Sequence, residues 1–327
     1  MEKFKQARDI GGRYLLNQIQ KDGSFGNPEL GVTEYYKVPA ALTVCGMSAA
    51  ASKLLDWIRT NGLYPNGDFG PRPLNTIHSY YYTYYNSWVI KGAHRLGQFD
   101  ISNQGIRFLL NFWDERSGGF YSSVNEQKEE TEQDLWVVSG SAWCAIYTGN
   151  LHVAKGVGKW MKNLMNEQPN YPEQLWTVYS RSAGLITEIR NNDTFRYLLD
   201  RDETRDQSFF HPGIAAGFLV ELYQATGESE WLDLAYKYME FCDYVGDYHF
   251  SLLRAGKVGW AASLMYKITR DEKFRKMAIR VGDNLIDSQS SKGFWEWSES
   301  DKTGPNNDAT AELVVWLDEI HQSVGKD

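Results

Sequence analysis

Two kinds of amphipathic segment alternate along this chain, and this alternation constrains the fold more than any other feature. Residues 38–50, 213–223 and 258–268 are rich in Ala, Gly and Ser, with aromatic residues between them. Small residues let backbones approach closely, so these segments should be crowded on several sides. Residues 229–242 and 271–286 carry charges on one face, which predicts helices with one side in water. We therefore expect an inner ring of helices inside an outer ring.

The loops between these segments also come in two kinds. Turns from a small-residue segment to a charged one are short, as at 225–229 and 268–273, which is typical of antiparallel neighbours. The opposite connections are long and contain glycine; they comprise residues 20–34, 63–78, 114–133 and 290–308. The long loops should therefore gather at one end of the ring. Loops longer than about 12 residues in a compact domain are usually functional, so this end is the predicted mouth of a site.

Composition narrows the class of protein. The 327 residues are 42% hydrophobic and 23% charged, as in an ordered globular protein. The formal net charge of −8 argues against a nucleic-acid partner, because such binding depends on clustered Lys and Arg. The chain lacks an apolar run of about 20 residues, so we expect no membrane insertion. Residues 1–20 lack the apolar core of a signal peptide, which predicts a cytoplasmic protein. The three cysteines are isolated from one another in the sequence, which predicts free thiols.

Parts of the chain resemble known families. Residues 211–242 and 261–295 are similar to consecutive hairpins of the six-hairpin α/α-toroid superfamily, which includes N-acylglucosamine 2-epimerase-like enzymes and several glycosidases. Residues 14–26 and 284–295 are similar to the glutamine, glycine and aromatic repeat of terpene cyclases and prenyltransferases, which are toroids too. The resemblance spans most of the chain in pattern and implies architecture more than chemistry.

The helix pairs predict an all-α fold, an (α/α)6 toroid, as one domain over residues 1–327. Residues 173–189 are expected to form one of its helices. A seventh hairpin stays open as an alternative around residues 192–200, where the outer helix would be short. The competing architecture is an open α-solenoid that binds proteins. The repeat has no fixed length and its aromatic residues lie on the crowded helices, so we favour the toroid.

Residues 78–88, HSYYYTYYNSW, concentrate aromatic side chains in one segment. In a helix, Tyr81, Tyr84, Tyr85 and Trp88 share one face. Tyrosine combines a flat ring with a hydroxyl, which suits a sugar ring or a polyene with one polar end. The alternative is that these rings pack between the helices. A purely structural core rarely has to satisfy so many buried hydroxyls, so we expect the segment to form one wall of a central cavity.

Other inner segments also begin with aromatic and charged residues. If all of them start at the same end, their first residues converge on one pocket with aromatic walls and a few charged groups, which is typical of a small-molecule site. The residues expected to bind substrate there are Tyr36, Tyr81, Tyr84, Trp88, Trp136, Trp176, Tyr179, Arg181, Arg254, Trp260 and Glu312.

Two histidines are the first candidates for proton transfer. His211 precedes Pro-Gly at a predicted helix start, where the helix dipole favours a neutral imidazole, and His78 occupies the equivalent position in its own hairpin. The candidate carboxylates are Asp308, Asp134 and Glu34. Each carboxylate can instead cap a helix, and capping is the default interpretation of Asp308. Each histidine can instead be a packing or capping residue.

The absent motifs limit the chemistry. The sequence contains no DDxxD, DxDD, HExxH, P-loop or convincing GxGxxG motif, so we expect no metal and no cofactor. The leading hypothesis is a cofactor-independent enzyme that moves protons on a carbohydrate or similar ring, as an epimerase, isomerase, lyase or hydrolase. The alternatives are an isomerase or cyclase of a terpenoid or polyketide intermediate, and a non-catalytic binding toroid. A small-molecule substrate is expected, and the sequence predicts no particular oligomeric state.

Overall fold

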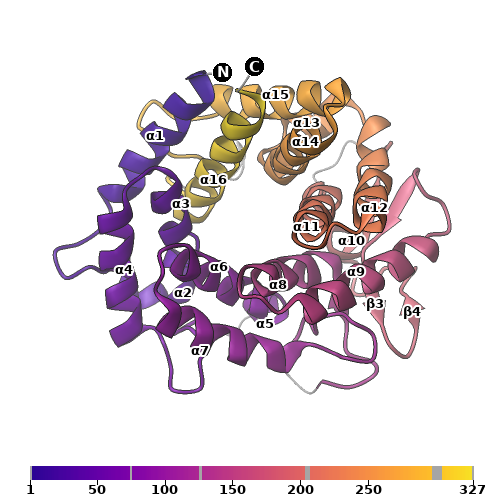
Figure 1. The fold of residues 1–327 in the computed structure, drawn as a ribbon, viewed down its shortest axis with the longest axis horizontal. Helices are drawn as coiled ribbons and strands as arrows, with labels where there is room; N and C mark the ends of the chain where they lie inside the picture. The colour runs from indigo at the N-terminus through magenta and orange to yellow at the C-terminus, as the bar shows by residue number, and fades with distance from the viewer. Residues whose placement is uncertain (1, 74–75, 125–126, 203–206, 297–303, 326–327) are drawn as a thin grey trace.

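The computed structural model describes residues 2–73, 76–124, 127–202, 207–296 and 304–325, and these form a ring of paired helices (Figure 1). The inner helices are α3 (Val38–Val44), α6 (Tyr82–Arg95), α8 (Leu135–Tyr147), α11 (Phe210–Thr226), α14 (Gly256–Thr269) and α16 (Asn307–Val324). The outer helices are α1 (Glu2–Leu16), α4 (Ser48–Asn61), α7 (Phe99–Leu109), α9 (Leu151–Asn166), α12 (Ser229–Glu240) and α15 (Glu272–Asp287). The predicted (α/α)6 toroid is confirmed.

The ring is closed by helices from the two ends of the described chain. Helix α1 packs against α16, and α16 also contacts α3 and α14. Figure 1 shows the two ends of the chain next to each other at this junction. Since inner and outer helices alternate and run antiparallel, all the inner helices start at the same end of the ring, as predicted.

Small residues allow the inner helices to touch. A Cβ atom at Gly213 of α11 would overlap the backbone of α14 at Lys257 and Val258. We therefore expect Gly213→Ala to lower the free energy of unfolding by about 1–3 kcal/mol, because overpacking forces the two backbones apart. Urea denaturation would measure the change.

Gly246→Ala is the matched control for this substitution. Gly246 has φ −71° and no atom within 4 Å of its built Cβ, so the control should be close to neutral. Equal losses in the two variants would contradict close contact between the inner helices.

Three long loops start with the same local structure. After α1, α4 and α7 the chain turns back through a glycine with positive φ and forms one antiparallel bridge to a buried phenylalanine. The bridges are Ile19↔Phe25, Leu63↔Phe69 and Trp113↔Phe120, and the turn glycines are Gly23, Gly67 and Gly118. These phenylalanines are at most 1% exposed, so they anchor the start of each loop in the core. This repeated turn accounts for the glycine and aromatic pattern seen in the sequence.

The prediction of a helix over residues 173–189 is wrong. Residues there form strands β2 (Gln174–Trp176), β3 (Val178–Ser180) and β4 (Gly184–Leu185). With β1 (Gln133–Asp134) and β5 (Leu198–Asp200) they form two small antiparallel sheets, ordered β1-β3-β4 and β2-β5. Aromatic and β-branched residues favour strands in this segment, and Gly184 makes the turn with φ 70°. The alternative of a seventh hairpin is therefore also wrong for residues 192–200, which form α10 (Thr194–Tyr197) and β5.

Short elements surround the mouth of the ring. They are 3₁₀ turns η1 (Pro28–Leu30), η2 (Leu110–Phe112), η3 (Phe241–Asp243) and η4 (Leu253–Ala255), and helices α2 (Val32–Tyr35), α5 (Thr76–Tyr80) and α13 (Asp247–Ser251). Among the described residues, no helix has the length and apolar character needed to cross a membrane.

Four tryptophans fill the middle of the ring. Trp88, Trp143, Trp260 and Trp316 come from α6, α8, α14 and α16, and each is at most 3% exposed. Their ring centroids lie 5.2 Å apart for Trp88 and Trp143, 5.1 Å for Trp143 and Trp260, and 4.7 Å for Trp260 and Trp316. We call this group the tryptophan plug. It separates the mouth where the inner helices begin from the mouth where they end.

Candidate active site

A buried carboxylate holds two lysines where the inner helices begin. Glu312, on the second turn of α16, forms ion pairs with Lys37 through Oε2 and with Lys257 through Oε1. The indole of Trp316 donates a hydrogen bond to Oε1 at 3.1 Å, and the Tyr84 hydroxyl donates to Oε2 at 3.5 Å. Both lysines and Glu312 are at most 4% exposed. Three inner helices thus meet at one carboxylate.

Burial and charge set the protonation of this group. Burial lowers the pKa of Lys257 to about 8, and Glu312 opposes that change only in part. Burial also disfavours the ionised form of Glu312, but the two ammonium groups outweigh it and hold the pKa of Glu312 well below its usual value. Burial lowers the pKa of Lys37, but Asp308 and Glu312 outweigh it, so that pKa is raised. The carboxylate is therefore unsuited to act as a proton donor near neutral pH.

Asp308 faces the same pocket and does not cap α16. The cap is Asn306, whose Oδ1 accepts a hydrogen bond from the backbone N–H of Ala309 at 2.8 Å. The default interpretation of Asp308 as the capping residue is therefore wrong, because the helix starts two residues earlier than that interpretation required. Asp308 instead forms an ion pair with Lys37 at 2.8 Å. Glu34 lies nearby and accepts a hydrogen bond from Asn307 at 2.8 Å.

Aromatic rings surround the charged groups. The ring centroids of Tyr36 and Tyr85 are 4.7 Å apart, those of Tyr84 and Trp136 are 4.9 Å apart, and those of Tyr81 and Trp136 are 4.1 Å apart. Burial raises the pKa of Tyr36 and of Tyr84 well above 10, so both keep their hydroxyl protons. The stretch 78–88 thus forms an aromatic wall beside the lysines.

His211 and Asp134 form a second polar pair beside this wall. The Nδ1 atom of His211 lies 2.9 Å from the carbonyl oxygen of Ser208, which can only accept a hydrogen bond, so Nδ1 carries a proton. Nε2 is 3.7 Å from Oδ1 of Asp134. The two side chains are 1% and 0% exposed, and Nε2 has no hydrogen-bond partner among the described residues. A buried ring nitrogen that has no hydrogen-bond partner in the protein is expected where a ligand supplies that partner.

Asp134 caps a helix with one carboxylate oxygen, while the other oxygen has no hydrogen-bond partner among the described residues. Its Oδ1 accepts hydrogen bonds from the backbone N–H groups of Trp136 at 2.8 Å and Val137 at 3.3 Å at the start of α8. Oδ2 is buried and has no partner within the described chain. Capping therefore uses one oxygen and leaves the other available to a ligand.

His78 stands at the edge of the site. Its Nδ1 lies 2.6 Å from the Tyr85 hydroxyl, and the side chain is half-buried. Burial, followed by the charge of Arg72, lowers the pKa of His78. This histidine is therefore neutral at pH 7 and contacts the wall rather than the lysines.

Several residues predicted to bind substrate lie elsewhere. Trp88 and Trp260 belong to the tryptophan plug. Trp176 packs in a separate small apolar cluster, Tyr179 packs near Trp160 with ring centroids 5.9 Å apart, and Arg181 pairs with Asp114 and Glu129. Trp176, Tyr179 and Arg181 were expected on an inner helix, and the strands that replace it carry them away from the pocket.

The segment between α9 and α11 adds groups to the rim of the site. Arg254 lies 4.7 Å from the ring centroid of Phe195, and Arg196 lies 3.8 Å from that of Tyr80. Phe210, at the start of α11, lies 4.7 Å from Trp136 and 5.1 Å from the Lys257 ammonium. Phe195 and Arg196 were not predicted to lie in the site, because only the fold of residues 167–202 and 207–209 brings them to the mouth.

Lys37 and Lys257 lie at the starts of inner segments that were expected to converge, but neither was among the residues predicted to bind substrate or to transfer protons. A sequence signal existed for both, because each is a lone cation at the start of a segment rich in small residues. A cation there has no water around it and needs a buried partner.

Solved structures match the chain over its full length, whereas no protein-family model and no curated protein sequence matches it. A D-mannose isomerase has a TM-score of 0.72 at 13% identity, covering 98% of this chain and 97% of its own. The α-1,6-mannanase of Salegentibacter sp. HEL1_6 has a TM-score of 0.68 at 13% identity, covering 98% and 99%. An unsaturated glucuronyl hydrolase specific for heparin has a TM-score of 0.66 at 12% identity, covering 99% of both chains. The chain thus has the six-hairpin α/α-toroid fold, which it shares with these three structures of an isomerase, a mannanase and a hydrolase.

Proposed function

We propose that the protein is a cofactor-independent sugar isomerase or epimerase that works by proton transfer. The observation that carries this proposal is the buried Nε2 of His211, which lies 3.7 Å from Oδ1 of Asp134 and has no hydrogen-bond partner among the described residues. An imidazole can act as a general base when its second ring nitrogen accepts the proton of the substrate.

The geometry supports a division of roles. His211 would remove the proton from the carbon next to the carbonyl of an open-chain sugar and return it to the neighbouring carbon or to the other face. The negative charge that develops on the carbonyl oxygen would be stabilised by the ammonium groups of Lys37 and Lys257, which Glu312 holds in place. Trp136 and Tyr84 would pack against the apolar face of the sugar.

The same groups favour isomerisation over hydrolysis. Glycoside hydrolysis generally needs one carboxylic acid and one carboxylate. Glu312 is held ionised between two lysines, so it is a poor acid. Variants of the Salegentibacter mannanase with two successive aspartates replaced are inactive, and this chain contains no two adjacent aspartates.

The polarity of the pocket disfavours a terpenoid or polyketide cyclase. A cyclase site should be mostly apolar with one acid at its end, whereas this pocket buries two lysines, a histidine and two carboxylates. The donors and acceptors on these side chains that have no partner in the protein could form hydrogen bonds with the hydroxyl groups of a sugar.

Isomerisation in deuterated water tests the proposal directly. The protein would be incubated with D-mannose, D-glucose, D-fructose and N-acetylated hexosamines, with product and deuterium at C2 followed by NMR. Enzyme-dependent product carrying deuterium at C2 is the expected result. Release of reducing ends from oligosaccharides, without exchange at C2, would replace isomerisation with hydrolysis.

We expect the pH dependence of kcat to follow the protonation of the Lys257 side chain. Its ammonium form is the one that stabilises the oxyanion, and burial lowers its pKa to about 8. Because the group loses its proton as pH rises through that value, kcat is expected to fall above about pH 8. In Lys257→Arg the side chain stays charged to much higher pH, so this alkaline limb should disappear. An unchanged limb near pH 8 in that variant would assign it to another group.

A further inference from the structure

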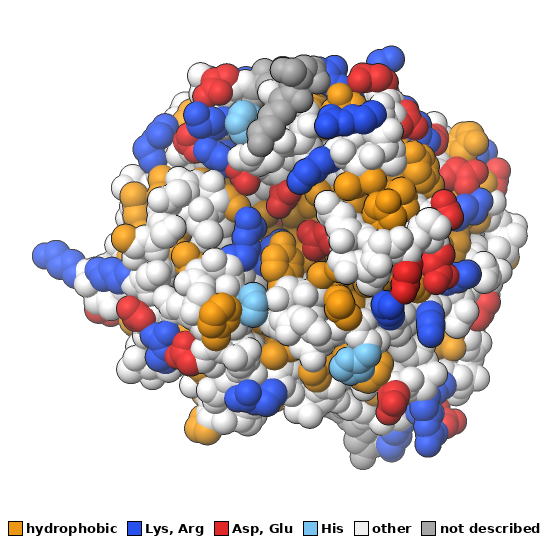
Figure 2. All heavy atoms as spheres, in the orientation of Figure 1, with side chains coloured by type: hydrophobic (Ala, Val, Ile, Leu, Met, Phe, Trp, Pro, Cys, Tyr) orange, Lys and Arg blue, Asp and Glu red, His pale blue; other side chains and the backbone are white. Residues whose placement is uncertain are grey.

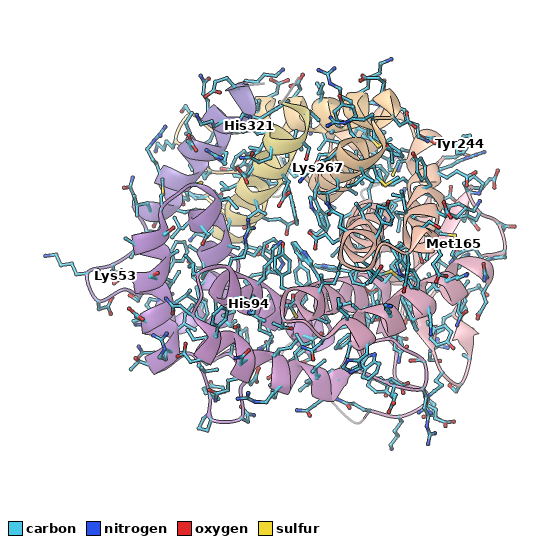
Figure 3. All side chains as sticks on the ribbon, in the orientation of Figure 1. Lys53, His94, Met165, Tyr244, Lys267 and His321 are labelled. Atoms are coloured by element: carbon cyan, nitrogen blue, oxygen red, sulfur yellow. The ribbon has the colours of Figure 1, made fainter. Side chains whose placement is uncertain are left out.

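The mouth where the inner helices end holds a second group of charged side chains. Figure 2 shows this face, which is hollowed in the middle of the ring, with acidic and basic side chains beside hydrophobic ones. In Figure 3, which has the same orientation, His94, Lys267 and His321 lie near the last turns of α6, α14 and α16. The tryptophan plug separates this mouth from the candidate active site.

Lys91 is buried one turn before the end of α6, beside Trp143 of the tryptophan plug. Its side chain is 1% exposed, and Nζ has no hydrogen-bond partner among the described residues. The ammonium lies 3.0 Å from the ring centroid of Trp143 and 5.1 Å from that of Tyr147. Burial lowers the pKa of Lys91 to about 7. Up to three N–H donors therefore stand without an acceptor, which is costly unless something else supplies one.

Two half-buried carboxylates face Lys91 from other helices. Glu221 comes from α11 and Glu319 from α16. Burial raises the pKa of Glu221 to about 7 and raises that of Glu319, and Lys91 and Arg95 offset part of each change. Lys91 thus interacts with both carboxylates through its charge, but it forms no direct ion pair with either of them among the described residues. Lys91 therefore offers donors, and Glu221 and Glu319 offer acceptors, from the later turns of three inner helices.

We propose that this hollow is a second binding site, for a neutral polyhydroxylated molecule such as a sugar, distinct from the candidate active site. A hydroxyl both donates and accepts, so it can bridge the Lys91 amine and the carboxylates of Glu221 and Glu319. Lys91 and Arg95 offset part of the effect of burial on both carboxylates, and an uncharged ligand adds no further charge to this group. The Tyr147 ring offers the apolar surface that a sugar face packs against.

The test follows the indole N–H signals of the tryptophans by NMR during titration with D-mannose, D-glucose and glycerol. Trp143→Phe identifies the signal of the plug next to Lys91, and Trp136→Phe identifies one at the opposite mouth. A saturable shift of the Trp143 signal is expected with at least one sugar. In Glu221→Gln/Glu319→Gln the dissociation constant should rise by about 10-fold or more, as expected when hydrogen bonds worth about 1.4 kcal/mol are lost.

Controls separate this site from the active site. The double variant should fold, because glutamine removes carboxylates whose ionisation burial opposes. His211→Asn should leave the Trp143 titration unchanged, and Glu240→Gln, on the outer helix α12, should do the same. A Trp143 signal that no sugar moves, that moves only with an alkylammonium ion, or that moves equally in the double variant would overturn the proposal. These results do not depend on any catalytic activity.

Discussion

Replacing His211 with asparagine is expected to lower kcat for sugar isomerisation by about 10²–10⁴-fold, with little change in KM. The asparagine amide can still donate to the carbonyl oxygen of Ser208, as Nδ1 of the histidine does at 2.9 Å. It offers no basic nitrogen in place of Nε2, so the substrate would still bind while its proton stays in place. Steady-state kinetics and the rate of deuterium exchange at C2 measure the loss.

The matched control for this variant is His152→Asn. His152 is exposed and lies on the outer helix α9, with its ring centroid 5.7 Å from that of Trp113. The control should retain both kcat and the exchange rate. If His211→Asn keeps deuterium exchange at the wild-type rate, another group is the base and the proposed role of His211 is wrong.

Glu312→Gln is expected to lower the free energy of unfolding by about 3–5 kcal/mol at pH 7, because it leaves two buried ammonium groups without their shared counterion. Lys257 has a folded-state pKa of about 8, below its unfolded value, so it can release its proton as pH rises. The loss should therefore be smaller at pH 9 than at pH 7. Urea denaturation at both pH values measures it.

Two further variants define this effect. Glu240→Gln removes an exposed carboxylate that pairs with Lys237 at 2.6 Å, and exposed pairs of this kind contribute about 0–1 kcal/mol. Adding Lys257→Met to Glu312→Gln removes the ammonium that has lost its carboxylate, whereas Lys37 keeps its ion pair with Asp308, and should recover part of the stability. A Glu312→Gln variant as stable as the Glu240→Gln control would show that the lysines are not paired as described.

The ring and its mouth could be predicted because they depend on local patterns. The small residues of 213–223 and the charged face of 229–242 distinguish inner from outer helices, and loop length identifies the end where the long connections gather. The two small sheets could not be predicted in the same way. Residues 173–189 have an apolar spacing compatible with a helix, and the partner of β3 is β1, more than 40 residues earlier in the chain.

The sequence could indicate which residues lie near the candidate site, but it could not indicate which of their side chains form ion pairs with each other. The helix starts place His211, Asp134 and Glu312 at one end of the ring, and their role in a site stays a prediction. The pairing of Lys37 with Glu312 joins residues 275 positions apart, and no local pattern encodes that contact. Asp308 shows the limit of capping rules, because three successive candidates, Asn306, Asn307 and Asp308, compete for one position.

The closure of the ring by α1 and α16 has a consequence for biosynthesis. A ribosome delivers Lys37 early and Glu312 only near the end, so a growing chain holds an open arc of helices with an unneutralised lysine and uncovered tryptophans. Such an arc is a natural client for chaperones, and a chain truncated before α16 lacks the carboxylate that organises the pocket. We therefore expect the proposed site to be complete only after α16, the last inner helix, has been synthesised.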